Sequence, residues 1–382
     1  MNKKEIKSIL FELKNSSGTH SPSISTIQDK IKDFHVEIDG CFLSNPYATN
    51  LFMDNFNKDL IKTGKIRDLL EFYPPQNQVV SKSLEKVLNI PSKNIFVGNG
   101  AIEIIQAVIH KFVKRKICVI IPTFSSYYEF VENDKELIYY HLQKDNDYKL
   151  DAEDYVKFIK QNKPDTIVII NPNNPNGAYL SNQDFHYLLS ELSFVENIII
   201  DESFIHFAYD DDNLDLLSSE NLVLENKNLI IIKSMSKDFG IAGLRAGYAI
   251  MNENRVSSLL KNGFLWNVSG LTDYFFRLYS QNKFISDYEK IRKKYIVHTN
   301  HFFNELKSIN EINVLPSKAN FALIELNHGM SSSDFFIDLL VDHKIYVRDC
   351  SDKIGLDGEY VRIASRSFDE NEIIINSIRK MF

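Results

Sequence analysis

Short runs dominated by hydrophobic residues mark the central part of the chain. They lie at residues 94–97, 117–121, 166–170, 197–200 and 228–232, and each is bounded by polar or turn residues. Segments with a helical pattern separate them, such as AIEIIQAVIHKFV after the first run. Strands that are apolar on both faces and alternate with helices are typical of a mostly parallel sheet that helices cover on both sides. The pattern therefore predicts an α/β fold.

The pattern changes near residue 266. A long helical stretch covers about 272–306, strands are expected near 321–326 and 360–364, and a last helix near 370–381. These elements predict a smaller α+β domain over residues 266–382, after a large domain over residues 51–265. Residues 1–50 show no strong periodicity. We expect them to form an arm that packs against the small domain or against a partner subunit.

Composition and charge mainly exclude other classes of protein. The 382 residues carry a dispersed net charge of −7, without a basic stripe for nucleic acid or an anionic membrane surface. The apolar runs are too short to span a bilayer, and the first residues lack the pattern of a signal peptide. Cys41, Cys118 and Cys350 have no metal-binding or disulfide spacing. We therefore expect a cytoplasmic protein without a metal site.

Turn-forming and polar residues directly follow the predicted strands. They include GNG at residues 98–100, PTF at 122–124, NPNNPNG at 171–177, DE at 201–202 and SMSK at 234–237. Open α/β sheets bind their ligands at the carboxyl ends of the strands. We therefore expect the functional site at this edge of the sheet.

The segment SMSKDFGIAGLRAGY at residues 234–248 carries the most specific motif. It resembles the Schiff-base lysine motif of fold-type-I aminotransferases, the class I/II superfamily, which use pyridoxal 5'-phosphate (PLP). The resemblance implies that Lys237 forms a Schiff base with the cofactor aldehyde. It also implies that Ser234 and Arg245 hold the cofactor phosphate, with Ser236 as a helper. A lone lysine after serine is usually a solvated loop residue, but fifteen matching positions after a buried strand argue against that.

Three other motifs agree with this resemblance, and in the expected order. NPNNPNG resembles the Asn-Pro loop of the superfamily, in which Asn174 would bond the ring hydroxyl oxygen. Asp201 would pair with the pyridine nitrogen, although such a residue can also cap a helix. Gly100 and Ala101 open a helix, whose free N–H groups would bind the cofactor phosphate. The resemblance therefore implies a seven-stranded, mostly parallel sheet in the large domain.

Two aromatic residues match the superfamily as well. Phe124 would stack on the cofactor ring, although a core phenylalanine is the alternative among 27 such residues. Tyr73, in FYPPQ, matches a tyrosine that reaches the cofactor phosphate of the neighbouring subunit. If this match holds, the protein is a homodimer with shared active sites.

The resemblance runs from about residue 44 to residue 362 and is closest to the histidinol-phosphate aminotransferase and threonine-phosphate decarboxylase branch. Arg362 matches the arginine that binds the substrate's α-carboxylate, and Asn174 lies beside the same site. Arg348, in VRDCSDKIGL, and His20, in HSPSI, would bind a phosphate on the substrate. A surface arginine and an exposed histidine of a mobile arm are the alternatives for Arg362 and His20. Phe204 stands where the aminotransferases usually have tyrosine.

These features favour decarboxylation of a small O-phosphorylated amino acid, phosphoserine or phosphothreonine, to the amino-alcohol phosphate. Transamination is the alternative, with glutamate as amino donor and a substrate such as histidinol phosphate or a dihydroxyacetone-phosphate-like ketone. The outcome depends on which substrate bond lies perpendicular to the cofactor ring, and the sequence does not resolve that. A non-catalytic PLP-binding protein is a further alternative, but the intact motif set and the lack of a DNA-binding segment argue against it.

Overall fold

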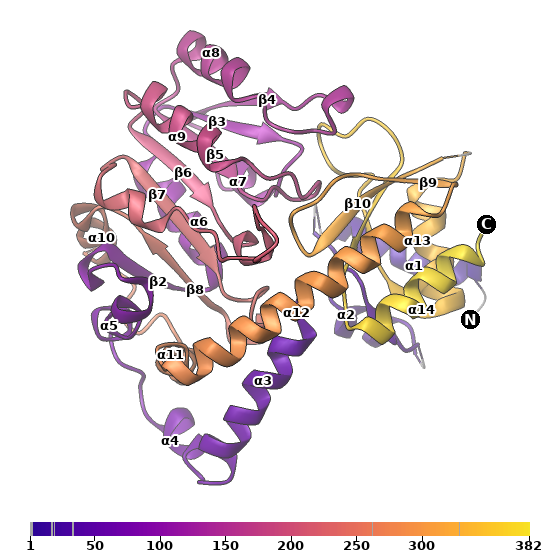
Figure 1. The fold of residues 1–382 in the computed structure, drawn as a ribbon, viewed down its shortest axis with the longest axis horizontal. Helices are drawn as coiled ribbons and strands as arrows, with labels where there is room; N and C mark the ends of the chain where they lie inside the picture. Colours follow the sequence, from indigo (N-terminus) through magenta and orange to yellow (C-terminus); the bar gives the residue numbers. More distant parts are fainter. Residues whose placement is uncertain (1–2, 17, 19, 33, 262, 328) are drawn as a thin grey trace.

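A seven-stranded sheet forms the centre of the larger part of the protein in the computed structural model, which describes residues 3–16, 18, 20–32, 34–261, 263–327 and 329–382 (Figure 1). In spatial order its strands are β2 (Ile95–Asn99), β8 (Ala246–Ile250), β7 (Leu229–Ser234), β6 (Asn197–Asp201), β5 (Thr166–Ile170), β3 (Lys116–Ile121) and β4 (Glu136–His141). β8 is antiparallel to both of its neighbours, and the pairs from β7 to β4 are parallel. The expected α/β fold with a mostly parallel sheet is confirmed.

Helices cover both faces of this sheet because its strands are apolar on both sides. Val119 and Ile230 face a cluster that includes α6 (Gly100–Phe112), α7 (Ser126–Glu129) and α10 (Glu253–Leu260). Their neighbours Ile120 and Ile231 face α5 (Asn77–Leu88), α8 (Ala152–Asn162), α9 (Asn182–Glu191) and α11 (Gly270–Tyr279). Successive strand residues point to opposite faces, so each run fills two cores.

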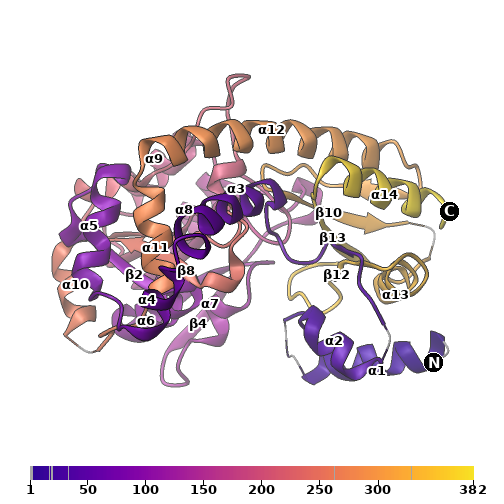
Figure 2. The same cartoon turned by 90° about the horizontal axis from the view of Figure 1, so that it is seen from below.

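A second, antiparallel sheet of four strands lies in the described C-terminal part of the chain. Its spatial order is β12 (Arg348–Asp349), β13 (Tyr360–Ala364), β10 (Phe321–Leu326) and β9 (Ile312–Val314). The helix α12 (Asn282–Lys307) runs from α11 to this sheet, as Figure 2 shows, and packs there with α13 (Ser332–His343) and α14 (Phe368–Arg379). The expected helical stretch is therefore two helices, α11 and α12, with a short break between them.

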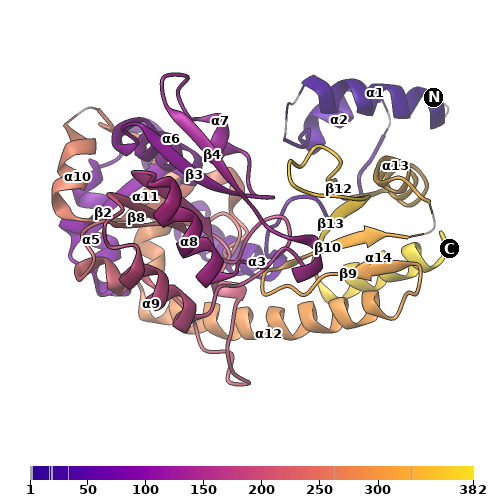
Figure 3. The same cartoon turned by 90° about the horizontal axis from the view of Figure 1, so that it is seen from above.

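The N-terminal residues form helices where the sequence shows no strong periodicity. They are α1 (Lys3–Ser16), α2 (Ile24–Lys30) and α3 (Pro46–Phe56). Ile6, Leu10 and Leu13 of α1 pack with Ile337 and Leu340 of α13, and Figure 3 shows α1 and α2 beside α13. The division into residues 1–50, 51–265 and 266–382 stays a prediction.

Smaller elements complete the described chain. β1 (Ile38–Asp39) pairs in parallel with β11 (Ile345–Tyr346) in a separate two-stranded sheet, which joins the N-terminal segment to the chain just before β12. Asn45 caps α3 by accepting hydrogen bonds from Tyr47 N and Ala48 N. The short helices are η1 (Asn57–Ile61), α4 (Ile66–Glu71), η2 (Ser92–Asn94), η3 (Lys144–Asn146), η4 (Ile205–Phe207), η5 (Glu220–Leu224) and η6 (Ala242–Leu244). Among the described helices, none combines the length and hydrophobicity that crossing a membrane requires.

Candidate active site

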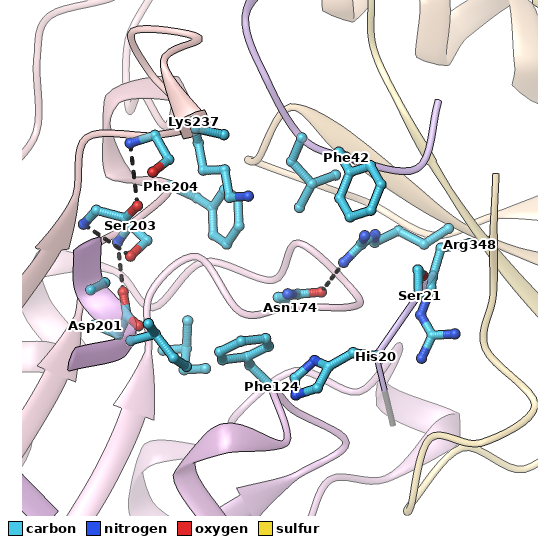
Figure 4. A pocket seen from close by; sticks show the side chains of 18 of the residues that line it. His20, Ser21, Phe42, Phe124, Asn174, Asp201, Ser203, Phe204, Lys237 and Arg348 are labelled. Atoms are coloured by element: carbon cyan, nitrogen blue, oxygen red, sulfur yellow. Dashed lines mark hydrogen bonds between the residues drawn. The ribbon is translucent and has the colours of Figure 1, made fainter. Parts of the chain in front are cut away.

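A cavity of about 250 Å³ lies between the large sheet, the small sheet and the N-terminal segment (Figure 4). The parallel register of β5, β6 and β7 aligns the carboxyl ends of these strands, since Ile170 lies opposite Asp201 and Asp201 opposite Ile232. Eleven of the predicted site residues line the cavity: His20, Ala101, Phe124, Asn174, Asp201, Ser234, Ser236, Lys237, Arg245, Arg348 and Arg362. The sequence motifs therefore meet at one place, on the expected edge of the sheet.

Lys237 projects into this cavity from the loop that follows β7. The backbone carbonyl of Lys237 accepts a hydrogen bond from Asn45 N at 3.0 Å, which joins this loop to the start of α3. Burial, and then the nearby charges of Arg362 and Arg245, lower the pKa of Lys237 to about 8. An amine that loses its proton this readily is suited to form an imine with an aldehyde.

A close-packed cradle lies at the N-terminus of α6. Gly100 has φ +75°, and a Cβ added there would lie 2.4 Å from Nη2 of Arg245. A Cβ on Gly247 of β8 would lie 2.8 Å from Ala101 N, so glycine is required at both positions. Ser234 and Arg245 line the cavity beside this helix start. Hydroxyls, a guanidinium and free helix N–H groups together suit a phosphate.

Asp201 ends β6 and is buried. Its Oδ2 accepts a hydrogen bond from the Tyr127 hydroxyl at 2.8 Å, and its Oδ1 accepts one from Ser203 N at 2.8 Å. Burial raises the pKa of Asp201 despite these donors. A positively charged partner in the cavity would therefore stabilise the ionised carboxylate. Phe124 follows β3 and lines the cavity between Asp201 and His20, as Figure 4 shows.

Arg362 and Asn174 contact each other across the cavity. Arg362 lies on β13, is buried, and donates from Nη1 to Asn174 Oδ1 at 2.6 Å and from Nη2 to Cys41 O at 2.8 Å. Its Nε is buried without a hydrogen-bond partner among the described residues. A buried guanidinium with an unused donor beside a cavity is suited to bind a carboxylate.

A second group of basic side chains lies away from Asp201. Figure 4 shows His20 and Arg348 on the opposite side of the cavity. Arg348 donates from Nη1 to Asp349 O at 2.7 Å and from Nη2 to Asp352 Oδ2 at 2.6 Å. The half-exposed His20 has its Nε2 3.3 Å from Glu129 Oε2. These side chains extend from β12 and the N-terminal segment rather than from the large sheet.

Lys353 also lines the cavity, although no motif predicted a role for it. It is only 9% exposed, and burial, followed by the charge of Arg348, lowers the pKa of Lys353 to about 8. It lies in the segment VRDCSDKIGL, which also carries Arg348, and that position was a signal for it. Ser21 and Phe42 were missed too, since only tertiary packing brings the N-terminal segment to the site.

Tyr73 lies outside this cavity. Its side chain is 83% exposed, and its ring centroid lies 5.3 Å from that of Trp266 on the surface of the large domain. The predicted contact of Tyr73 is with another subunit, so its role stays a prediction. Gly100 is not part of the cavity lining but supports it, as the close approach of Arg245 shows.

The residues of the cavity fit PLP. An amine of lowered pKa at Lys237 suits the cofactor aldehyde, and the buried carboxylate of Asp201 suits a protonated ring nitrogen. The cradle at Gly100, which a Cβ would fill, suits the cofactor phosphate. The donor set therefore matches the three polar groups by which proteins hold this cofactor.

Comparisons with known proteins agree with this assignment. The L-serine phosphate decarboxylase of Campylobacter jejuni subsp. jejuni serotype O:2 is 52% identical over 379 residues, which are 99% of this chain and 97% of that protein. The solved structure of a decarboxylase from Sulfurospirillum multivorans is 44% identical with a TM-score of 0.95, and the match covers 99% of this chain and 96% of that one. A histidinol-phosphate aminotransferase of Methanococcus aeolicus is 28% identical over 341 residues, 88% of each protein.

A family model described as aminotransferase class I and II matches residues 45–378, which is most of the chain. The resemblance that the motifs indicated is thereby confirmed, and the chain belongs to the aminotransferase class I and II family.

Proposed function

We propose that this PLP-dependent enzyme decarboxylates L-serine phosphate to ethanolamine phosphate and carbon dioxide. The observation that carries the proposal is a pair of cations, Arg348 and Lys353, in the same cavity as Arg362, which can bind a carboxylate. A substrate with two anionic groups uses both positions. The similar proteins named above that act on serine phosphate support the same reaction.

The groups of the cavity have distinct tasks in this reaction. PLP, when bound, supplies a ring that withdraws electrons from the bonds at the substrate's Cα. Arg362 binds the α-carboxylate, while Arg348 and Lys353 bind the phosphate, so the substrate is held at both ends. The bond between Cα and the carboxylate carbon breaks, carbon dioxide leaves, and the electron pair stays on Cα. Lys237 then delivers a proton from Nζ to Cα.

Incubation of the holoenzyme with L-serine phosphate tests this function. We expect carbon dioxide and ethanolamine phosphate in equal amounts, with no conversion of the cofactor to its pyridoxamine form. L-Threonine phosphate and L-serine serve as comparison substrates, and L-serine should react far more slowly because it leaves Arg348 and Lys353 without an anion. Formation of 2-oxoglutarate from glutamate and a phosphorylated ketone, with the pyridoxamine form accumulating, would instead establish an aminotransferase.

The charge of Lys353 predicts a pH dependence of substrate binding. Because burial lowers the pKa of this ammonium to about 8, it loses its charge above that pH in the free enzyme. We expect kcat/KM for L-serine phosphate to fall above pH 8 or so. Lys353→Met should raise KM roughly 10- to 100-fold at neutral pH, because it removes a charged hydrogen-bond donor.

Lys353→Arg is the matched control, since a guanidinium keeps its charge over this range. It should retain most of the substrate affinity and lose the alkaline decline in kcat/KM. An unchanged KM in Lys353→Met, or the same alkaline decline in both variants, rules out this role for Lys353.

We also propose that the protein is a homodimer and acts in the cytoplasm. Leu70, Phe72 and Tyr73 are 73%, 64% and 83% exposed, and the ring of Tyr73 contacts that of the half-exposed Trp266. An apolar surface of this kind usually marks an interface. A second copy of the chain that covers this surface would bring Tyr73 to the neighbouring active site, as the sequence predicts. The three cysteines are free thiols, which supports a reducing compartment.

A further inference from the structure

Asp349 is the centre of a buried network behind the phosphate-binding residues. It follows Arg348 in β12, so its side chain points to the face opposite the cavity, and it is 4% exposed. Lys14 of α1 donates to Asp349 Oδ2 at 2.6 Å. Further donors are Ser332 Oγ, Ser333 Oγ and Ser351 N, at 2.8–2.9 Å from the carboxylate oxygens. Burial alone would raise the pKa of Asp349, but the charge and hydrogen bond of Lys14, with these donors, lower it to about 2.

The same lysine contacts the turn that connects Arg348 with Lys353. Lys14 Nζ lies 2.7 Å from Ser351 Oγ and 3.9 Å from Asp352 Oδ1. Within the turn, Arg348 donates to Asp349 O and Asp352 Oδ2, and Lys353 N donates to Cys350 O at 3.0 Å. Lys14 therefore contacts three of the four residues in the turn 349–352, and Arg348 and Lys353 flank this turn.

We propose that Lys14 is a positioning residue: through Asp349, Ser351 and Asp352 it holds the turn 349–352 so that Arg348 and Lys353 converge on the substrate phosphate. The identity of that substrate rests on the proposed function. Arg348 and Lys353 repel each other when both approach one phosphate. Surrounding contacts therefore have to fix their positions before the substrate binds. Lys14 supplies such a contact from the far end of the sequence.

Two other lysines of α1, Lys3 and Lys7, show what a purely structural contact of this helix involves. Lys7 pairs with Asp334, and Lys3 lies 2.7 Å from Asp338 Oδ1, both on α13. Their side chains are about half exposed, whereas that of Lys14 is 17% exposed. Lys7 therefore joins α1 to α13 and does not contact the turn 349–352, which makes it a matched control.

Titration of the PLP-loaded enzyme with inorganic phosphate tests this role without any turnover. In Lys14→Met we expect the dissociation constant for phosphate to rise about tenfold, and KM for L-serine phosphate to rise by a similar factor with kcat within about twofold. Lys7→Met should keep wild-type values, and Lys14→Arg should restore most of the affinity. The thermal midpoint of Lys14→Met should fall further than that of Lys7→Met, because it leaves the buried Asp349 carboxylate without its cation. Phosphate affinity is therefore compared at a temperature well below both midpoints.

Equal phosphate affinities in Lys14→Met and Lys7→Met overturn the proposal, and so does a wild-type holoenzyme that binds no phosphate. A fall in kcat without a change in phosphate affinity overturns it as well. If the wild type binds phosphate with the expected dependence on Lys14 but releases no carbon dioxide from L-serine phosphate, the positioning role stands and the proposed reaction fails.

Discussion

The Lys237→Ala variant is expected to release no measurable carbon dioxide from L-serine phosphate, with a loss of at least about 10⁴-fold in kcat. The reason is that this amine both binds the cofactor aldehyde and moves the proton at Cα, so one substitution removes two tasks. PLP should still bind through the cradle at Gly100 and through Asp201, but without the absorbance of a protein imine. Absorption spectra and carbon dioxide release measure the two effects separately.

Lys261→Ala is a suitable control for this experiment because that lysine is exposed at the end of α10. It should keep the imine absorbance and the wild-type rate. A Lys237→Ala enzyme that still forms the imine, or that turns over at a rate near wild type, would contradict the assignment of Lys237 and with it the chemistry proposed for the cavity.

Replacement of Asp201 by asparagine is expected to lower kcat by about 10²- to 10³-fold. The amide preserves the shape of the side chain but removes the negative charge that would pair with the cofactor ring nitrogen. Affinity for PLP should fall as well, which fluorescence titration of the apoenzyme with the cofactor measures. Neither effect requires a change in the fold, so the circular dichroism spectrum should match that of the wild type.

Tyr127→Phe separates the charge of Asp201 from its hydrogen bonds. It removes the hydroxyl that donates to Oδ2 and leaves the carboxylate in place. Loss of a single hydrogen bond of this kind should cost about tenfold or less in kcat. If Tyr127→Phe is as damaging as Asp201→Asn, the position of the carboxylate rather than its charge limits the reaction.

The parts of the fold that could be predicted are those with a strong local signal. β3, β5, β6 and β7 are uninterrupted apolar runs, because both of their faces are buried. β4 and β8 were not recognised. β4 is an edge strand with partly exposed residues. β8 begins inside the lysine motif 234–248, where glycine and polar residues interrupt the apolar pattern.

The same distinction applies to the site. Lys237, Asn174 and Asp201 stand at strand ends within motifs, so local sequence was enough to place them together. Lys353 and Phe42 reach the cavity only because the small sheet and the N-terminal segment pack over it. No periodicity or motif encodes that packing, since it depends on contacts between residues hundreds of positions apart, such as Lys14 with Asp349.

The position of β13 between β12 and β10 has a consequence for biosynthesis. Arg362 lies on this strand, whereas His20 and Ser21 leave the ribosome more than 300 residues earlier. A nascent chain can pair all strands of the large sheet and still lack the centre of the small one. The active site is therefore complete only when translation is nearly finished. A chain that stops before β13 contains the lysine for the cofactor but lacks Arg362 and the centre of the small sheet.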